Sequence, residues 1–275
     1  MNMQSNDWEY PTACDYCGVF LPKTTLVVNA HGSAHDLVEC VCGLRFYSPR
    51  RSLEWVAAQF EAGSWSPEAD LCLEKGVLAV RPEILEPEAQ KRLLREFALS
   101  RYQNACKLAG FVPSATTRLY EVGASIGWFL KACIDQGIAD PRRSGMCDQN
   151  PRACILASTS LKLGNVSCGA FLDVSPEPAP FDVFVANDYV EHTYTPHADL
   201  GKMRSLAAPG AAIYIKTFLD EMDEPRGRQY LMPPWHAYHW TRATLRRALE
   251  TEGWRITSWD EEPLWAQVAV YGVAV

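Results

Sequence analysis

Four cysteines near the N-terminus have a spacing that can bind a metal ion. Cys14 and Cys17 form a C-x-x-C pair, Cys40 and Cys42 form a C-x-C pair, and a glycine follows each pair. Short loops of this kind point sulfur atoms at one position, as a tetrahedral zinc–thiolate site requires. We therefore expect a structural Zn²⁺ ion, because four thiolates leave no coordination position open for catalysis. Two alternatives stay open: the cysteines are incidental, or one sulfur is replaced by a nearby histidine, His31 or His35.

A second set of candidate residues follows two short apolar strands. Residues 118–122 are predicted to form a strand that contains Glu121, and Gly123 and Gly127 follow it in a turn. In open α/β sheets the ligand binds outside the carboxyl ends of the strands, where such a turn lets the backbone approach it closely. Asp148 ends the next predicted strand, where a carboxylate can accept hydrogen bonds from both hydroxyls of a ribose. The pattern predicts a nucleoside cofactor, and the alternative is an ordinary turn with a surface aspartate.

Glu121, the acid before the first glycine, indicates the kind of cofactor that the turn binds. A dinucleotide site favours a G-x-G-x-x-G turn that approaches a pyrophosphate. A carboxylate at Glu121 is a poor neighbour for a pyrophosphate. It suits a ligand that carries an ammonium group, such as the methionine half of S-adenosylmethionine.

Asp188, Glu191 and His192 are candidates for acid–base or metal chemistry. If they lie on a helix, positions i, i+3 and i+4 share a face, and their two oxygens and one nitrogen can converge. The alternative is that Glu191 and His192 cap a helix and hold a loop.

A third candidate set lies in a long insertion, residues 218–240. His236, Tyr238 and His239 occur there beside two tryptophans. Histidine has a pKa near neutrality and suits a general base, and aromatic rings can line an apolar substrate. We expect the catalytic residues among His192, Glu191, His236, His239 and Tyr238, with a packed lid or loop as the alternative for the insertion.

Strands and helices alternate from about residue 117 onward. Strands are predicted at 118–122, 144–147, 165–171, 181–186, 211–217, 254–259 and 265–275. Helices are predicted at 128–136, 151–161, 197–206 and 241–251, the last of them capped by Thr241. This alternation predicts a doubly wound α/β sheet of seven strands, and the last two strands, with no helix between them, predict an antiparallel pair at its edge.

The composition is that of a globular protein with one large domain and an appendage. The chain has 275 residues, a formal net charge of −7 and 48% hydrophobic residues. No apolar run approaches the ~18–20 residues of a bilayer span, and the first ten residues are polar, so we expect a cytoplasmic protein. We divide the chain into a zinc-binding module (1–50), a helical connector (51–115, with helices at 52–60 and 86–108) and a cofactor-binding domain (116–275).

The glycine turn and three later segments together resemble a known family. Glu121-x-Gly123-x-x-x-Gly127-Trp128 resembles the first motif of class I S-adenosylmethionine (SAM)-dependent methyltransferases. FDVFVANDYVEH (181–192) resembles their fourth-strand motif, LAAPGAAIYI (206–215) the turn into their fifth strand, and residues 245–254 a typical helix end. The resemblance runs from about residue 117 to 275. The sequence departs from the motif at Ser125, where the family usually has its middle glycine.

The resemblance implies a Rossmann-like fold and SAM as the cofactor, and it assigns the cofactor contacts by position. The implied contacts are Glu121, Gly123, Ala124, Gly127 and Trp128 at the methionine and ribose, Asp148 at the ribose hydroxyls, Phe171 and Leu172 at the adenine, and Asn187 and Asp188 beneath the sulfonium.

The cysteine-rich segment resembles the zinc-ribbon-like leader of some class I methyltransferases, including sugar C-methyltransferases and other natural-product enzymes. That resemblance covers about residues 10–50. It implies methyl transfer to a small-molecule acceptor in secondary metabolism.

Three alternatives remain for the function. They are a zinc-ribbon RNA methyltransferase, a methyltransferase for a protein or peptide, and a non-catalytic SAM-binding module, the last suggested by Ser125. The net charge of −7 argues against a nucleic-acid partner. No membrane partner is expected, and a homodimer stays open.

Overall fold

The fold is described from a computed structural model of the chain. The described residues are 7–19, 23–30, 33–61, 99–223, 235–262 and 267–275. His31, the side chain of His35 and the first part of the predicted helix 86–108 lie outside this description. Its last part, residues 99–108, is helical as predicted.

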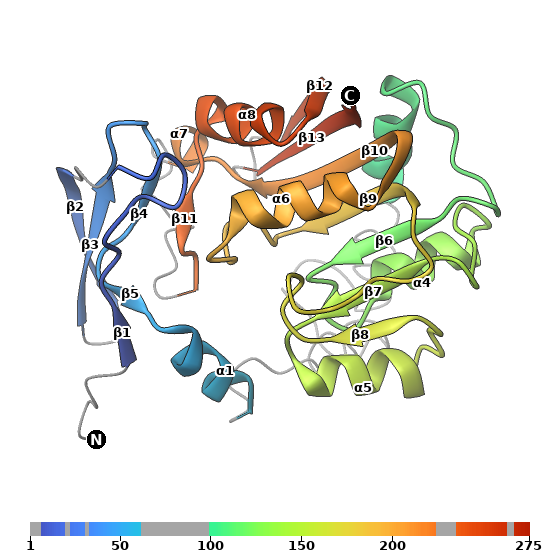
Figure 1. The fold of residues 1–275 in the computed structure, drawn as a ribbon, viewed down its shortest axis with the longest axis horizontal. Helices are drawn as coiled ribbons and strands as arrows, with labels where there is room; N and C mark the ends of the chain where they lie inside the picture. Colours follow the sequence, from blue (N-terminus) through green and yellow to red (C-terminus); the bar gives the residue numbers. More distant parts are fainter. Residues whose placement is uncertain (1–6, 20–22, 31–32, 62–98, 224–234, 263–266) are drawn as a thin grey trace, which may run out of the picture.

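A seven-stranded sheet forms the centre of the described part of the chain (Figure 1). In spatial order its strands are β12 (Trp254–Glu262), β13 (Gln267–Ala274), β10 (Ala207–Phe218), β9 (Phe181–Asn187), β6 (Leu119–Val122), β7 (Gly145–Asp148) and β8 (Val166–Cys168). The five strands from β10 to β8 are parallel, and β13 pairs antiparallel with β10 and with β12. The predicted Rossmann-like sheet with an antiparallel terminal pair is confirmed. The crossovers change direction between β6 and β9, which is where open α/β sheets bind ligands.

Helices cover both faces of this sheet. They are α4 (Trp128–Asp135), α5 (Pro151–Thr159), α6 (Pro196–Ser205) and α8 (Arg242–Thr251). Neighbouring residues of a strand point to opposite faces. Phe184 of β9 therefore packs in one core cluster with Leu200 of α6. Val185 packs in another with Phe129 of α4 and Tyr102 of the helical segment 99–108. Among the described helices, none combines the length and apolar character that crossing a bilayer requires.

Two predicted helix starts are confirmed by their capping bonds. Ser52 Oγ accepts a hydrogen bond from the Trp55 backbone N–H at the start of α1 (Leu53–Glu61). Thr241 and Thr244 form a reciprocal capping box at the start of α8.

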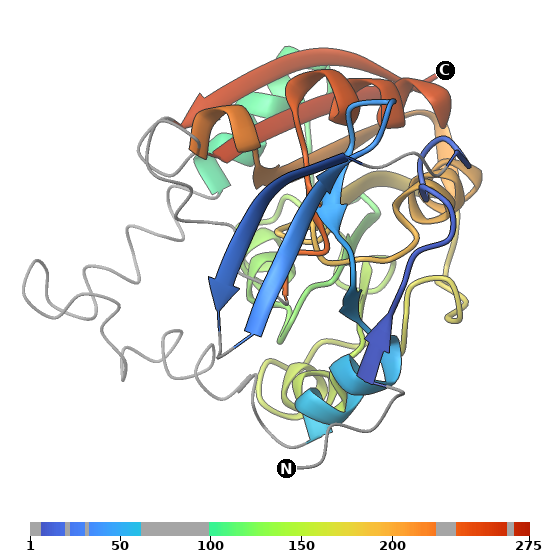
Figure 2. The same cartoon turned by 90° about the vertical axis from the view of Figure 1, so that its left-hand side faces the viewer.

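A second sheet lies at one end of the molecule (Figure 1) and is seen from its outer side in Figure 2. Its strands are β2 (Lys23–Ala30), β3 (Ser33–Glu39), β4 (Arg45–Tyr47) and β11 (Tyr238–His239), in the order β11-β4-β3-β2. The first three are antiparallel neighbours in the chain, but β11 comes from the insertion after β10. The insertion thus completes the sheet of the N-terminal module, which the sequence did not predict.

Arg50 contacts several segments at this end of the molecule. It lies in β5 (Arg50–Arg51), which pairs with β1 (Trp8–Glu9). Its guanidinium is buried and donates to Asp15 and to Glu9, each at 2.9 Å, and to the Tyr238 hydroxyl at 2.9 Å. It also lies 4.3 Å from the centre of the Tyr194 ring. One cation therefore links the first strand, the cysteine segment, the insertion and the turn before α6.

We expect Arg50→Met to lower the free energy of unfolding by about 2–3 kcal/mol, because it leaves two partly exposed carboxylates and a buried hydroxyl without their cation. Urea titration followed by circular dichroism measures this. Lys107→Ala, at an exposed helical position, should change stability by less than about 0.5 kcal/mol. Equal effects of the two substitutions would show that the Arg50 contacts do not stabilise the fold.

Candidate functional site

Two positions in the turn between β6 and α4 require glycine. Gly123 has φ 66° and Gly127 has φ 76°. A Cβ at Gly123 would lie 2.4 Å from Tyr189 Cδ2, and one at Gly127 would lie 2.4 Å from Met146 Sδ. Both contacts are far below van der Waals separation, so both positions need glycine for space as well as for conformation.

Ser125 keeps the conformation of the glycine that it replaces. Its φ is 50°, in the left-handed region that costs a side-chain-bearing residue about 1–2 kcal/mol. Its backbone N–H donates to Asp148 Oδ2 at 2.7 Å, and a charge-assisted bond of this kind offsets such a cost. Asp148 Oδ1 accepts from the Asn150 N–H at 2.8 Å. The structure therefore places the predicted ribose-binding carboxylate against the predicted cofactor turn.

Glu121 and Asn187 meet where the ends of β6 and β9 lie side by side. Glu121 Oε1 accepts from Asn187 Nδ2 at 3.4 Å, and Oε2 accepts from the Leu130 N–H in the first turn of α4 at 3.1 Å. The Glu121 side chain is 3% exposed, and this burial raises its pKa to about 8 despite the two hydrogen bonds. Without a cation beside it, this carboxyl group is mostly protonated at pH 7.

The remaining predicted cofactor residues differ in exposure. Ala124 is buried, and Trp128 is half-buried at the start of α4. Leu172 is 37% exposed, but Phe171 is 2% exposed and packs against Tyr120 in the core, which does not fit the predicted adenine contact. Of the pair after β8, only Leu172 presents a surface to a ligand.

Asp188 does not join Glu191 and His192 on a helix. The chain turns after β9, and Asp188 has φ 48°, which a helix cannot contain. Its carboxylate accepts from Lys216 Nζ at 2.6 Å instead. The idea that these three side chains share a helical face is therefore wrong, because residues 190–192 form a turn.

Glu191 and His192 instead converge with His236 from the insertion. One ligand-type atom from each of the three lies within 4.8 Å of the others. Glu191 and His236 are buried, and His192 is half-buried. The ring centres of His192 and His236 lie 4.8 Å apart. Two of the sequence-predicted sets thus supply one cluster, which we call the Glu-His-His cluster.

Neighbouring groups fix the orientation of this cluster. Thr217 Oγ1 donates to Glu191 Oε2 at 2.8 Å, and the other oxygen, Oε1, is buried with no hydrogen-bond partner among the described residues. His192 Nδ1 lies 2.8 Å from the Trp235 carbonyl oxygen. Because a carbonyl only accepts, Nδ1 carries the hydrogen and Nε2 carries the lone pair in the neutral ring.

Burial shifts the pKa values of the cluster toward its neutral forms. It raises the pKa of Glu191 to about 8, with a further contribution from the charge of Asp188. It lowers the pKa of His192 below its usual value. The imidazole of His192 is therefore neutral at pH 7 and can accept a proton or bind a cation.

Tyr238 and His239 lie on β11 and contribute mainly to packing. The Tyr238 hydroxyl bonds to Asp15 and accepts from Arg50, which places it between the N-terminal module and the insertion. The His239 ring packs edge-on against Tyr47 at 5.1 Å, and its centre lies 6.4 Å from that of His236. Neither belongs to the Glu-His-His cluster, although the sequence grouped both with His236.

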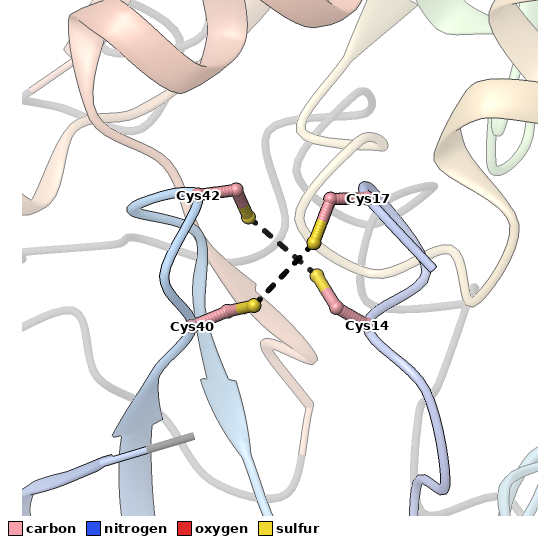
Figure 3. Close-up of side chains that lie close together, drawn as sticks. All are labelled: Cys14, Cys17, Cys40 and Cys42. Carbon is pink, nitrogen blue, oxygen red and sulfur yellow. Dashed lines mark hydrogen bonds between the residues drawn. The ribbon is translucent and has the colours of Figure 1, made fainter. Parts of the chain in front are cut away.

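The four N-terminal cysteines point their sulfur atoms at one position (Figure 3). The Cys14 and Cys42 sulfurs are 3.7 Å apart, and those of Cys17 and Cys40 are 3.5 Å apart. Tetrahedral zinc with Zn–S bonds of about 2.3 Å separates its sulfurs by about 3.8 Å. All four are free cysteines, so the geometry fits a zinc ion and not a pair of disulfides. Burial raises the pKa of Cys42 to about 11, so its thiolate needs a cation at neutral pH.

Comparison with known families agrees with this geometry. A family model described as a methyltransferase domain matches residues 88–258, which is more than half of the chain. This chain belongs to the class I SAM-dependent methyltransferases. The strand order of the central sheet is that of a methyltransferase domain.

Two solved structures share the fold of this methyltransferase. Magnesium protoporphyrin IX methyltransferase from Synechocystis PCC 6803, solved with bound SAH, is 12% identical, with a TM-score of 0.55 over 82% of this chain and 100% of that chain. A chain from the complex of the Haloferax volcanii Trm112 methyltransferase activator with a methyltransferase is 16% identical, with a TM-score of 0.52 over 66% of this chain and 93% of that chain. At these identities the likeness shows the fold alone. No curated protein matches the sequence.

Two residues at the candidate site were not predicted from the sequence. Lys216 pairs with Asp188, and Thr217 orients Glu191. Both follow the apolar run of β10, which is parallel to β9 and ends at the same edge. Polar residues at the end of a buried parallel strand were the signal that could have identified them.

We expect Glu121→Gln to flatten the dependence of stability on pH. Because the folded-state pKa of Glu121 is raised above its ordinary value of 4.5 to about 8, its contribution is fully present below pH 4.5 and is lost as pH rises through 8. From pH 5.5 to 8.5 the ligand-free wild type should lose on the order of 3 kcal/mol more unfolding free energy than the variant. Glutamine can still accept from Leu130, and the Asn187 amide can turn over to accept from it.

Urea unfolding at pH 5.5, 7.0 and 8.5 measures the difference. Parallel curves for wild type and variant would show that Glu121 is ionised in the folded protein across this range.

Proposed function

We propose that this methyltransferase transfers the methyl group of SAM to a small-molecule acceptor in secondary metabolism. The observation that carries the proposal is the Glu-His-His cluster, buried just beyond the end of β9. Asp188 precedes this cluster by three residues, at the position where the family resemblance puts the sulfonium. A buried cluster of polar groups suits a molecule small enough to enter it.

The cofactor would lie over the turn 123–127. Asp148 would accept the ribose hydroxyls, and Glu121 would face the methionine ammonium, whose charge would favour the ionised carboxylate. Leu172 would contact the adenine. Ser125 is compatible with this placement because it keeps the glycine-like backbone.

On the acceptor side, the Glu-His-His cluster would position the nucleophile and promote loss of its proton. A lone pair of the acceptor attacks the methyl carbon, the carbon–sulfur bond breaks, and its electrons stay on the sulfur of S-adenosylhomocysteine. Correct placement of these two partners supplies much of the rate enhancement in such a displacement.

The surface charges favour a small molecule over a nucleic acid. Arg118, Arg242 and Arg246 are each paired with a carboxylate, on Asp182, Glu261 and Glu250 respectively. Paired arginines in a chain of net charge −7 offer little attraction to a phosphate backbone.

The four cysteines would bind a structural Zn²⁺. The sulfur–sulfur distances and the absence of an open coordination position support this role. A module with so small a core depends on such an ion for its folding energy.

Incubation with S-[methyl-¹⁴C]adenosylmethionine and a fractionated extract of the source organism tests the acceptor class. We expect label in the small-molecule fraction. Label in RNA or protein would contradict the proposal, and no label in any fraction, with S-adenosylhomocysteine still bound, would favour a non-catalytic module.

Asp148→Ala is the matched control. It removes charge-assisted hydrogen bonds to the ribose, so calorimetry should show S-adenosylhomocysteine binding weakened by about 1–3 kcal/mol, with labelling reduced in parallel.

A further inference from the structure

The Glu-His-His cluster has the ligand set of a second metal site. Glu191 offers a carboxylate oxygen, and His192 and His236 each offer an imidazole nitrogen, all within 4.8 Å of one another. Ligands of one tetrahedral zinc ion lie about 3.4 Å apart, so small side-chain rotations bring these atoms to bonding distance. We propose that Glu191, His192 and His236 bind a divalent transition-metal ion, preferably Zn²⁺, separate from the ion of the four cysteines.

A buried orphan oxygen points independently to a ligand here. Glu191 is 1% exposed, and Thr217 occupies its Oε2. Its Oε1 is buried with no hydrogen-bond partner among the described residues. A buried carboxylate oxygen left unsatisfied is costly, and a bound cation satisfies it.

The surroundings of the cluster are those of a metal site. The His192 Nδ1–H donates to the Trp235 carbonyl, which directs the Nε2 lone pair to the ion, as metal-bound histidines commonly do. Phe218 stacks on the His236 ring at 5.4 Å and provides an apolar wall. The nearby cation Lys216 is neutralised by Asp188 at 2.6 Å, so it opposes a metal ion only weakly.

The donor atoms select the kind of metal. Two imidazole nitrogens and one carboxylate suit zinc and other first-row transition ions, whereas Mg²⁺ and Ca²⁺ prefer oxygen donors alone. Three protein ligands leave one position open. That position would take an oxygen of the acceptor and lower its pKa, a role that rests on the proposed function, whereas binding of the ion does not.

Cobalt titration tests the site directly. Co²⁺ added to metal-free full-length protein should bind in two equivalents. One should show the thiolate-to-cobalt charge-transfer absorption of the four cysteines, and the other should show only weaker d–d bands. A single equivalent, bound by thiolates, would overturn the inference.

Variants assign the second equivalent. His236→Asn and Glu191→Gln, each made separately, should weaken binding of the second equivalent at least tenfold and leave the charge-transfer band unchanged. Thr217→Val should weaken binding of the second equivalent ten- to hundredfold. His197→Asn is the matched control for the second equivalent, since His197 pairs with Glu252 and packs on Tyr16, outside the Glu-His-His cluster, and should leave that equivalent intact. Unchanged affinity for the second cobalt equivalent in the His236, Glu191 and Thr217 variants would also overturn the inference. Circular dichroism shows whether each variant is folded.

Cobalt binding and methyl labelling, measured on the same samples, test the metal site and the proposed function separately. One cobalt equivalent together with labelled small-molecule product refutes the metal site alone. Two equivalents with label only in RNA or protein refute the small-molecule acceptor alone.

Discussion

One backbone hydrogen bond joins the two chain segments that form the Glu-His-His cluster. The Tyr238 N–H donates to the Glu191 carbonyl at 3.1 Å and joins the insertion to the turn after β9. The Trp240 indole N–H donates to the neighbouring Val190 carbonyl at 3.1 Å and reinforces the contact. Since His236 lies two residues before Tyr238, this contact determines which side chains can meet Glu191. At the end of the insertion, the Asp220 N–H donates to the Trp240 carbonyl at 2.8 Å and adds a second backbone bond that fixes the insertion relative to the sheet.

The N-terminal module supports the same contact from the other side. β11 pairs with β4, and β4 follows the turn that carries Cys40 and Cys42. Arg50 adds a buried cation between this module and the Tyr238 hydroxyl. The cysteine module is therefore joined to the insertion, because the insertion supplies β11, the last strand of the module's sheet. The turn after β6, in contrast, contacts β7 through Asp148 and the segment after β9 through Tyr189.

The parts of the fold that depend on local pattern could be predicted from the sequence. Apolar runs identified the strands of the central sheet, and glycines at 123 and 127 identified the cofactor turn, because only glycine fits there. The cysteine pairs identified their own cluster. Each strand, the turn and each cysteine pair is defined by residues that are neighbours in the chain.

The Glu-His-His cluster could not be predicted in the same way. β11 has two residues, too few for a periodic pattern, and its partner β4 lies about 190 residues away in the chain. Asp188 was grouped with Glu191 and His192 by helical spacing, but its left-handed backbone and its bond to Lys216 set it apart. Tertiary pairing, and not spacing, brings His236 to Glu191.

We expect the cysteine module to hold the Glu-His-His cluster in place through β11, which pairs with β4. Hydrogen–deuterium exchange of Cys17→Ser and wild type, both purified with zinc, tests it most directly, because Cys17 is exposed and its substitution disturbs little but the metal site. We expect at least tenfold faster exchange of amides 237–240 in the variant, with β6 and β7 unchanged. Equal exchange of amides 237–240 in wild type and in a Cys17→Ser variant without zinc would show that the cysteine module does not hold β11 in place.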